Sequence, residues 1–116
     1  MIINLVWMKI KFSFSATPEY SLVRFESKIL SPDVLKTISP PDPIKNNFAN
    51  KGVILSGRGP IWLYGFLIHF YHPTLWVATY DPRLNGAVVV ESHTVKVKIG
   101  DVIPFENKIH EHNSSL

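Results

Sequence analysis

A glycine-rich stretch in the middle of the chain has the residue types that bind an anion. Residues 56–59 read Ser-Gly-Arg-Gly, follow the apolar run Gly52–Leu55 and precede Pro60. Proline suits the first position of a helix, because its fixed φ fits there and its missing N–H would have no partner. A junction of strand, glycine loop and helix directs free backbone N–H groups and the positive end of the helix dipole to one place, and arginine adds a planar fork that matches phosphate. We therefore expect a ligand-binding loop made of Ser56, Gly57, Arg58 and Gly59, with a plain surface charge as the alternative for Arg58.

A second pair of charged residues lies in the segment Tyr80-Asp81-Pro82-Arg83. Asp81 and Arg83 can contact a ligand together. The simpler interpretation is that Asp81 only shapes its turn, since Asp before Pro is common in loops, and that Arg83 only pairs with Asp81. The sequence leaves both interpretations open.

Three histidines could transfer protons or bind a metal ion. His69 and His72 lie three residues apart near the end of a predicted helix, a spacing that lets two imidazoles face one ligand, and His93 follows a predicted strand. For His69 alone, an ordinary buried or surface position is the simpler interpretation. His110 and His112 lie in the polar C-terminal tail, and we interpret them as incidental.

The elements that position these residues alternate between strands and helices. Period-two alternation, apolar runs and turn residues predict strands at Lys9–Ser15, Tyr20–Glu26, Val53–Ser56, Leu75–Tyr80, Ala87–Glu91 and Val102–Phe105. Helices are predicted from Pro32, with Ser31 as the cap, and from Pro60 to about Tyr71. Asn85-Gly86 is the favoured turn pair of a hairpin. We expect a single α/β domain over residues 8–106, with two helices, a mixed sheet whose central strands are parallel, and flexible ends at 1–7 and 107–116.

Strand direction separates the candidate residues into two groups. In a right-handed crossover the strands before Ser56 and before Asp81 run parallel, so the glycine loop, Asp81 and Arg83 share one end of the sheet, where ligands of open α/β sheets usually bind. The helix from Pro60 carries His72 to the opposite end, and the antiparallel return strand delivers His93 there. About 13 helical residues at 1.5 Å each separate the two ends by roughly 18–20 Å. His72 would therefore act on a ligand held by Arg58 of a different, head-to-tail subunit.

Composition limits the possible functions of this chain of 116 residues. It has no cysteine, which excludes thiol catalysis, disulfides and cysteine–metal sites and fits a reducing compartment such as the cytoplasm. The net charge of +3 tolerates an anionic partner, but no block of Lys or Arg indicates binding to duplex DNA. The uncharged run 59–80 contains prolines and histidines, and we interpret it as helix, turn and strand rather than as a membrane span.

The helix from Pro60 is apolar nearly all round. One of its faces is expected to join the core, and we favour a dimer contact for the other face over burial by the sheet. Trp62 and Trp76 are interpreted as core residues rather than as platforms for stacking bases.

With these residues and segments, the chain resembles a known family, the small CRISPR-associated ring nucleases called Csx-three, also named CRISPR ring nuclease three. The similarity covers about Leu30 to Val102. It is dense over the segments Gly52–Leu63, His69, Tyr71-His72, Tyr80–Leu84, Gly86–Val90 and Ser92-His93. Three positions depart from the family pattern: Tyr64 and Pro73 stand where histidines are usual, and Asn85 resembles an insertion in the hairpin.

The resemblance implies a variant of the CRISPR-associated Rossmann-like (CARF-like) fold and a homodimer. It implies degradation of cyclic tetraadenylate, the second messenger of type III CRISPR defence, with manganese as the supporting metal. Two dimers would stack around the ligand, as a tetramer or a filament. Carried over by position, Ser56, Gly57, Arg58, Asp81 and Arg83 face the ligand, His72 is the catalytic residue, assisted by Asp81 and Arg83, and His72 and His93 contact the metal.

The leading hypothesis is thus a metal-assisted phosphodiesterase for cyclic oligoadenylate. One alternative is a non-cleaving oligoadenylate sensor or sink, for which the Arg58 end alone would suffice. Another is a manganese-dependent exonuclease that trims linear RNA tails. A purely structural protein is the interpretation we favour least.

Overall fold

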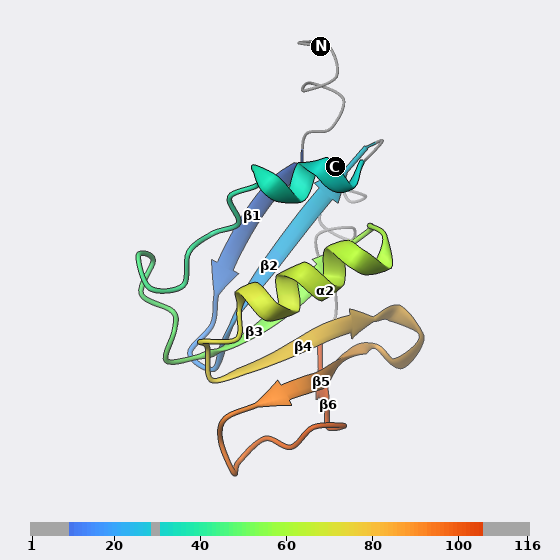
Figure 1. Ribbon diagram of the computed structural model, residues 1–116. Helices are drawn as coiled ribbons and strands as arrows, with labels where there is room; N and C mark the ends of the chain where they lie inside the picture. Colours follow the sequence, from blue (N-terminus) through green and yellow to red (C-terminus); the bar gives the residue numbers. More distant parts are fainter. Residues whose placement is uncertain (1–9, 29–30, 106–116) are drawn as a thin grey trace, which may run out of the picture.

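A computed structural model describes residues 10–28 and 31–105 of the chain. They form one six-stranded sheet in which the strands lie side by side in sequence order (Figure 1). The strands are β1 (Ile10–Ala16), β2 (Tyr20–Ser27), β3 (Gly52–Gly57), β4 (Trp76–Asp81), β5 (Gly86–Ser92) and β6 (Val102–Pro104). One α-helix, α2 (Ile61–Phe70), and two 3-10 helices, η1 (Pro32–Lys36) and η2 (Pro82–Leu84), complete the fold. The predicted terminal segments, and with them His110 and His112, lie outside the described residues.

The predicted mixed sheet with parallel central strands is confirmed. β2, β3 and β4 are parallel to one another, whereas β1 and β5 pair antiparallel at the two sides of this centre and β6 pairs antiparallel with β5. Because β3 and β4 run the same way, their carboxyl ends lie at one end of the sheet. We call this end, with the loops of residues 57–60 and 81–85, the arginine end. The opposite end, reached by the turn after α2 and by the end of β5, is the histidine end.

α2 and η1 cover the same face of the sheet (Figure 1). Fully buried Leu63 and Leu67 of α2 pack there with side chains of the three parallel strands. Burial of a leucine side chain contributes roughly 1.5–3 kcal/mol, so this layer holds α2 in place above β3 and β4. Ile61, by contrast, is 90% exposed, and no acidic or basic residue other than His69 occurs in α2.

The second face of the sheet is covered by the segment that follows β5. The buried residues on this face of the sheet are Leu22, Ile54, Trp76, Ala78, Ala87 and Val89. Half-buried Val97, Ile103 and Phe105, which follow β5 in the chain, pack against them. The predicted core position is confirmed for Trp76, which is 4% exposed. Trp62, in the first turn of α2, is only half-buried and packs against the edge of the core.

The prediction of two α-helices was wrong in one respect. Ser31 caps the first of them and Pro32 is its first residue, as expected, but the helix is a five-residue 3-10 helix. Pro40 disfavours a helical conformation at the residue before it and has no N–H to donate, so the segment after Thr37 leaves the helix. Within the described residues, no helical segment combines the length and the apolarity of a membrane span.

Two local predictions also need correction. Pro60 is the residue before the helix rather than its first residue: its ψ of 161° is extended, and its carbonyl accepts from the N–H of Leu63. Asn85-Gly86 does not form a two-residue turn, because only Asn85, with φ of 48°, has the positive φ that such a turn requires at both residues. Instead η2 closes the loop, and Asn85 follows as its left-handed cap.

Candidate functional site

An irregularity in β5 places an acidic residue on the side of the sheet that carries α2. Ala78 pairs with Val89 and Val77 pairs with Glu91, so Val90 is an extra residue in β5, a β-bulge. Successive residues of a regular strand point to opposite faces, and Glu91 would then share the second face with Ala87 and Val89. The bulge changes this alternation, and Glu91 lies with Val77 on the face of α2.

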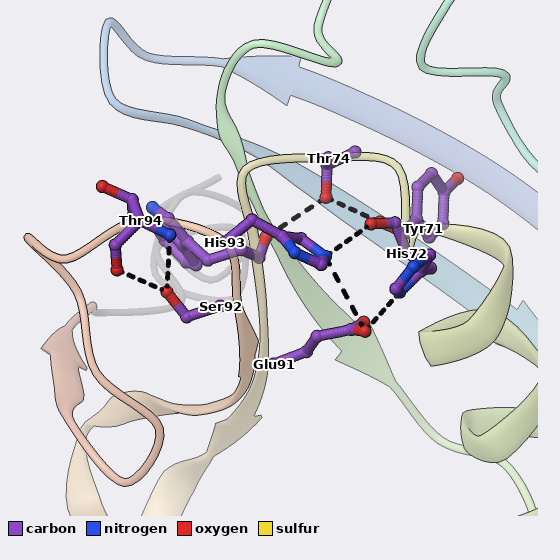
Figure 2. Close-up of polar contacts among 8 residues, drawn as sticks. Tyr71, His72, Thr74, Glu91, Ser92, His93 and Thr94 are labelled. Carbon is purple, nitrogen blue, oxygen red and sulfur yellow. Dashed lines mark hydrogen bonds and ion pairs between the residues drawn. The ribbon is translucent and has the colours of Figure 1, made fainter.

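Three side chains converge at the histidine end (Figure 2). A short hydrogen bond joins His72 Nδ1 to Glu91 Oε2, and the same carboxylate oxygen lies 3.8 Å from His93 Nε2. The two imidazole rings meet edge to face, with centroids 4.8 Å apart. The prediction that His72 and His93 lie together is therefore confirmed, and Glu91, for which sequence reasoning gave no role, joins them. We call His72, Glu91 and His93 the histidine–glutamate cluster.

The backbone holds the two histidines in place. The His93 N–H donates to the carbonyl of Leu75, and His93 Nε2 lies 3.1 Å from the carbonyl oxygen of His72. Thr74, which is 1% exposed, donates its hydroxyl to the carbonyl of Tyr71 at 2.7 Å, and so closes the turn that carries His72 (Figure 2). His72 and His93 remain exposed, so solvent or a ligand can reach the cluster.

The cluster has the composition of a metal site. One ligand atom from each residue, two imidazole nitrogens and one carboxylate oxygen, lies within 4.8 Å of the others. Two histidines and one carboxylate form a common set for divalent first-row metals, and carboxylate oxygen suits manganese. The residues therefore fit a divalent cation. His69 is exposed on the last turn of α2 and lies outside the cluster.

At the arginine end, Tyr64 occupies part of the glycine loop. Its hydroxyl donates to the carbonyl of Gly57 at 2.5 Å and accepts from the Gly57 N–H at 3.2 Å. The expectation that the N–H groups of this loop are free is thus wrong for Gly57. Burial raises the pKa of the Tyr64 hydroxyl, and the hydrogen bond to Gly57 opposes this shift. Tyr64 stands where the resemblance expects histidine, and here it fixes the loop that bears Arg58.

The other predicted ligand-binding residues differ in their accessibility. Ser56 is 5% exposed in β3, whereas Arg58 and Gly59 are exposed. The carbonyl of Arg58 accepts from the hydroxyl of Ser27 at 2.9 Å. In the described part of the chain no acidic side chain pairs with the guanidinium of Arg58, so its charge is available to an anion.

Asp81 and Arg83 pair with each other in this structure. Arg83 Nη2 lies 3.0 Å from Asp81 Oδ2, and the Asp81 carboxylate also accepts from the Arg83 N–H at 2.9 Å. These hydrogen bonds with the Arg83 side chain and backbone lower the pKa of Asp81, and the carboxylate in turn raises the pKa of Arg83. Asp81 therefore does shape its turn, while the Arg83 side chain is 87% exposed and can reach a ligand.

The two groups of residues lie at opposite ends of α2. Its ten residues span about 15 Å at 1.5 Å each, which separates the loop with Arg58 from the turn with His72. The chain thus presents an exposed cationic end and a histidine–glutamate end that cannot meet on one small ligand within one subunit.

Comparison with known proteins gives the family. A family model described as CRISPR-associated protein (Cas_csx3) matches residues 23–104, which include both ends of the sheet and the whole histidine–glutamate cluster. An uncharacterized protein from Aquifex aeolicus (strain VF5) is 62% identical over 87 residues, covering 74% of this chain and 78% of the relative. The chain is therefore a member of the Cas_csx3 family of CRISPR-associated proteins.

Proposed function

We propose that this protein is a metal-assisted ring nuclease, a phosphodiesterase that opens cyclic tetraadenylate. The observation that carries this proposal is the convergence of His72, Glu91 and His93 at the end of the sheet opposite Arg58 and Arg83. In a family of CRISPR-associated proteins, a cationic end and an end with proton-transfer or metal-binding groups match the two tasks of such an enzyme: holding a phosphodiester and cutting it. The CARF-like classification of the fold is part of the same proposal.

The chemistry needs no protein nucleophile. A 2′-hydroxyl of the substrate attacks the adjacent phosphorus atom in line and loses its proton. The bond from phosphorus to the 5′-oxygen breaks, and that oxygen takes up a proton. The products of this step are a 2′,3′-cyclic phosphate and a free 5′-hydroxyl. Most of the rate would come from positioning and from charge stabilisation.

Each residue has a distinct role in this scheme. Arg58 and Arg83 bind phosphate groups, and Arg83 turns from Asp81 toward the ligand. His72 either exchanges protons with the reacting oxygens, while Glu91 holds its imidazole in place through Nδ1, or helps to hold the metal ion. A divalent cation held by His72, Glu91 and His93 would supply positive charge close to the phosphate oxygens that gain charge in the reaction. The identity of this cation as manganese is implied by the resemblance.

The distance between the two ends requires more than one subunit. We propose a homodimer that uses the outer, apolar side of α2, where Ile61 is exposed, and dimers that stack head to tail so that the arginine end of one faces the histidine end of the next. A cyclic ligand between them would be held by one dimer and cut by the other. Activity then depends on protein concentration, because the two ends of a single dimer cannot meet on one ligand.

A test should measure cleavage of cyclic tetraadenylate with and without manganese over a series of protein concentrations. We expect a rate that rises more steeply than linearly with protein at low concentration. His72→Ala should abolish cleavage, whereas His69→Ala, a matched change of an exposed histidine outside the cluster, should not. Cleavage by His72→Ala at the wild-type rate would refute the assignment.

Mixing two inactive variants tests the head-to-tail arrangement. Arg58→Ala lacks the holding end but keeps His72, and His72→Ala lacks the cutting end but keeps Arg58. A mixture of the two should recover part of the activity that neither variant shows alone, because one complete interface can form between them. No recovery would refute the head-to-tail arrangement. Intact ligand after long incubation of the wild type would indicate a sensor or sink, and faster cleavage of linear than of cyclic tetraadenylate would indicate an exonuclease.

A further inference from the structure

Tyr71 is a buried titratable residue to which the ring nuclease chemistry assigns no role. It directly precedes His72, follows α2 as its C-terminal cap and is 0% exposed. Its hydroxyl donates to the carbonyl of Pro41 at 2.8 Å, in the segment between η1 and β3. Burial raises the pKa of this hydroxyl, and the charge of Asp42 adds to the shift, so the group remains a neutral hydrogen-bond donor.

The acceptor of this hydrogen bond belongs to a stiff stretch of chain. Residues 40–43 read Pro-Pro-Asp-Pro, and proline fixes its own φ and restricts the residue before it to extended conformations. The first and the last of these prolines are buried. The Asp42 carboxylate accepts from two backbone N–H groups of the turn that follows, at 2.8 and 3.2 Å. The carbonyl of Pro41 is thus a firm point of attachment for the Tyr71 side chain.

The ring of Tyr71 is held by the core as well. It packs against Phe48, with ring centroids 6.2 Å apart, and edge to face against Phe70, with centroids 5.0 Å apart. Tyr71 and Phe48 are both part of the buried core on the α2 side of the sheet. The side chain of Tyr71 therefore fixes the position of its own backbone, through core packing and one hydrogen bond to a stiff loop.

Tyr71 and Thr74 are the two buried residues of the turn that carries His72 (Figure 2). His72 and Pro73 lie between them and are exposed. The carbonyl of Tyr71 accepts from the hydroxyl and from the N–H of Thr74, at 2.7 and 3.0 Å. Because the backbone of His72 is held between these two anchors, a displacement of Tyr71 passes directly to the imidazole.

We propose that Tyr71 is a positioning residue: its buried side chain, tied to the carbonyl of Pro41, sets where the His72 imidazole meets the rest of the histidine–glutamate cluster. This role rests on the proposed function only for its effect on the rate of cleavage. The placement of His72 itself can be measured without a ligand or a metal ion, so the failure of one proposal can be distinguished from the failure of the other.

Loss of the Tyr71 hydroxyl should affect the cutting end and not the holding end. Tyr71→Phe keeps the ring and its packing, so the protein should still fold, but the turn with His72 loses its tie to Pro41. Loss of a group that orients a metal ligand costs about 10–100-fold in metal affinity or activity. Because Tyr71 acts through the backbone, we expect the lower end of this range: a kcat about tenfold lower. KM should not change, since Arg58 lies at the other end of α2.

NMR spectroscopy of the full chain, with a chelator and without ligand, measures the placement directly. The imidazole rings of His72 and His93 meet edge to face with centroids 4.8 Å apart. This contact shifts their ring-proton signals through ring currents and gives NOEs between the two rings. The chain has five histidines, and His72→Ala and His93→Ala identify the two sets of signals. In Tyr71→Phe both sets should move toward the positions of free histidine, and the NOE between the rings should weaken.

Tyr64→Phe is the matched control, because it removes the same hydroxyl from another tyrosine of the helical segment, at the arginine end. It should leave the signals of His72 and His93 unchanged, and any effect on cleavage should appear in KM. Pro41→Ala is a second variant that keeps Tyr71 intact and loosens only its support. It should move the two sets of signals in the same direction as Tyr71→Phe, but by less, and it decides the question if Tyr71→Phe does not fold.

Unchanged ring signals in both Tyr71→Phe and Pro41→Ala would overturn the positioning role. Equal changes in Tyr64→Phe would also overturn it, because they would indicate a general loosening of the fold. Changed signals with an unchanged kcat would refute the effect on cleavage. Changed signals in a protein that never cleaves cyclic tetraadenylate would leave the positioning role standing and remove the proposed function, whereas cleavage by Tyr71→Phe at the wild-type rate with unchanged signals would do the reverse.

Discussion

Replacement of Glu91 by glutamine tests whether the histidine–glutamate cluster holds a metal. The change keeps the size of the side chain and removes its charge. Loss of a residue that only orients a metal ligand already lowers affinity about 10–100-fold, so loss of a direct carboxylate ligand should lower the affinity for manganese at least about 100-fold, which is about 2.7 kcal/mol. Because Glu91 is half-buried beside two exposed histidines and does not belong to the hydrophobic core, the apo protein should still fold.

The assay is thermal unfolding with and without manganese. At a manganese concentration 100 times its dissociation constant, the wild type gains about 2.7 kcal/mol from binding, whereas Glu91→Gln, with at least 100-fold weaker binding, gains about 0.4 kcal/mol or less. For a domain of this size about 1 kcal/mol corresponds to roughly 4 °C, so the expected shifts in Tm are about 11 °C and about 2 °C or less.

Glu26→Gln is the matched control, because Glu26 is an exposed carboxylate on β2 outside the cluster. It should respond to manganese as the wild type does. If Glu91→Gln keeps the full shift while His72→Ala loses it, Glu91 is not a ligand and only orients His72. If neither change reduces the shift, the cluster is not the metal site and the reasoning fails.

Two further predictions concern glycine positions and the pH dependence of Asp81. Gly65→Ala should stabilise the protein by about 0.5–1 kcal/mol, since Gly65 is exposed in α2 with nothing within 4 Å of an added Cβ. Gly52→Ala should destabilise it strongly, because the added Cβ would push into the Trp76 ring. Urea unfolding of both variants should show changes in the free energy of unfolding of opposite sign. Asp81 has a lowered pKa in the folded protein, so its contribution to stability is present above its ordinary pKa and is lost as the pH falls through the folded value. Arg83→Ala should raise the pKa of the Asp81 carboxyl toward its ordinary value in an NMR titration, and an unchanged pKa would contradict the role of the Arg83 hydrogen bonds.

The arrangement of the two ends could be predicted because it follows from strand direction. The alternation of apolar runs and a helix indicated parallel β3 and β4, and parallel strands must bring the residues after them to one end of the sheet. The turn at Pro73 and the return of β5 then place His72 and His93 together at the other end. None of these steps requires knowledge of side-chain packing.

Glu91 could not be found in this way, because the sequence around it gives the opposite indication. Ala87, Val89 and Glu91 alternate as a regular strand would, which places Glu91 on the face away from His72. The run of valines that contains the bulge has no glycine or other residue to mark it. Bulges depend on the packing of both strands, and here only the pairing of Val77 with Glu91 reveals one.

The contact of Tyr64 at the arginine end could not be predicted from the sequence either. On sequence grounds it is a departure from the family pattern, and its partner could not be identified because Gly57 contributes only backbone atoms to the contact. The hydrogen bonds to Gly57 mean that the loop is held in place before any ligand binds. The Gly57 N–H is therefore not available to an anion, whereas the exposed charge of Arg58 is.

The β-bulge in β5 and the hydrogen bonds of Tyr64 help to explain why activity should depend on the association of dimers. Each end is prepared on its own: one by a hydroxyl that fixes the glycine loop, the other by an extra strand residue that brings a carboxylate to two histidines. Because α2 lies between them as a rigid spacer, neither end can compensate for the other within a subunit. If the proposed function is correct, substitutions that weaken contacts between dimers should lower the rate at low protein concentration, and a high protein concentration should restore it. Loss of His72 or Glu91, in contrast, should not be restored by concentration.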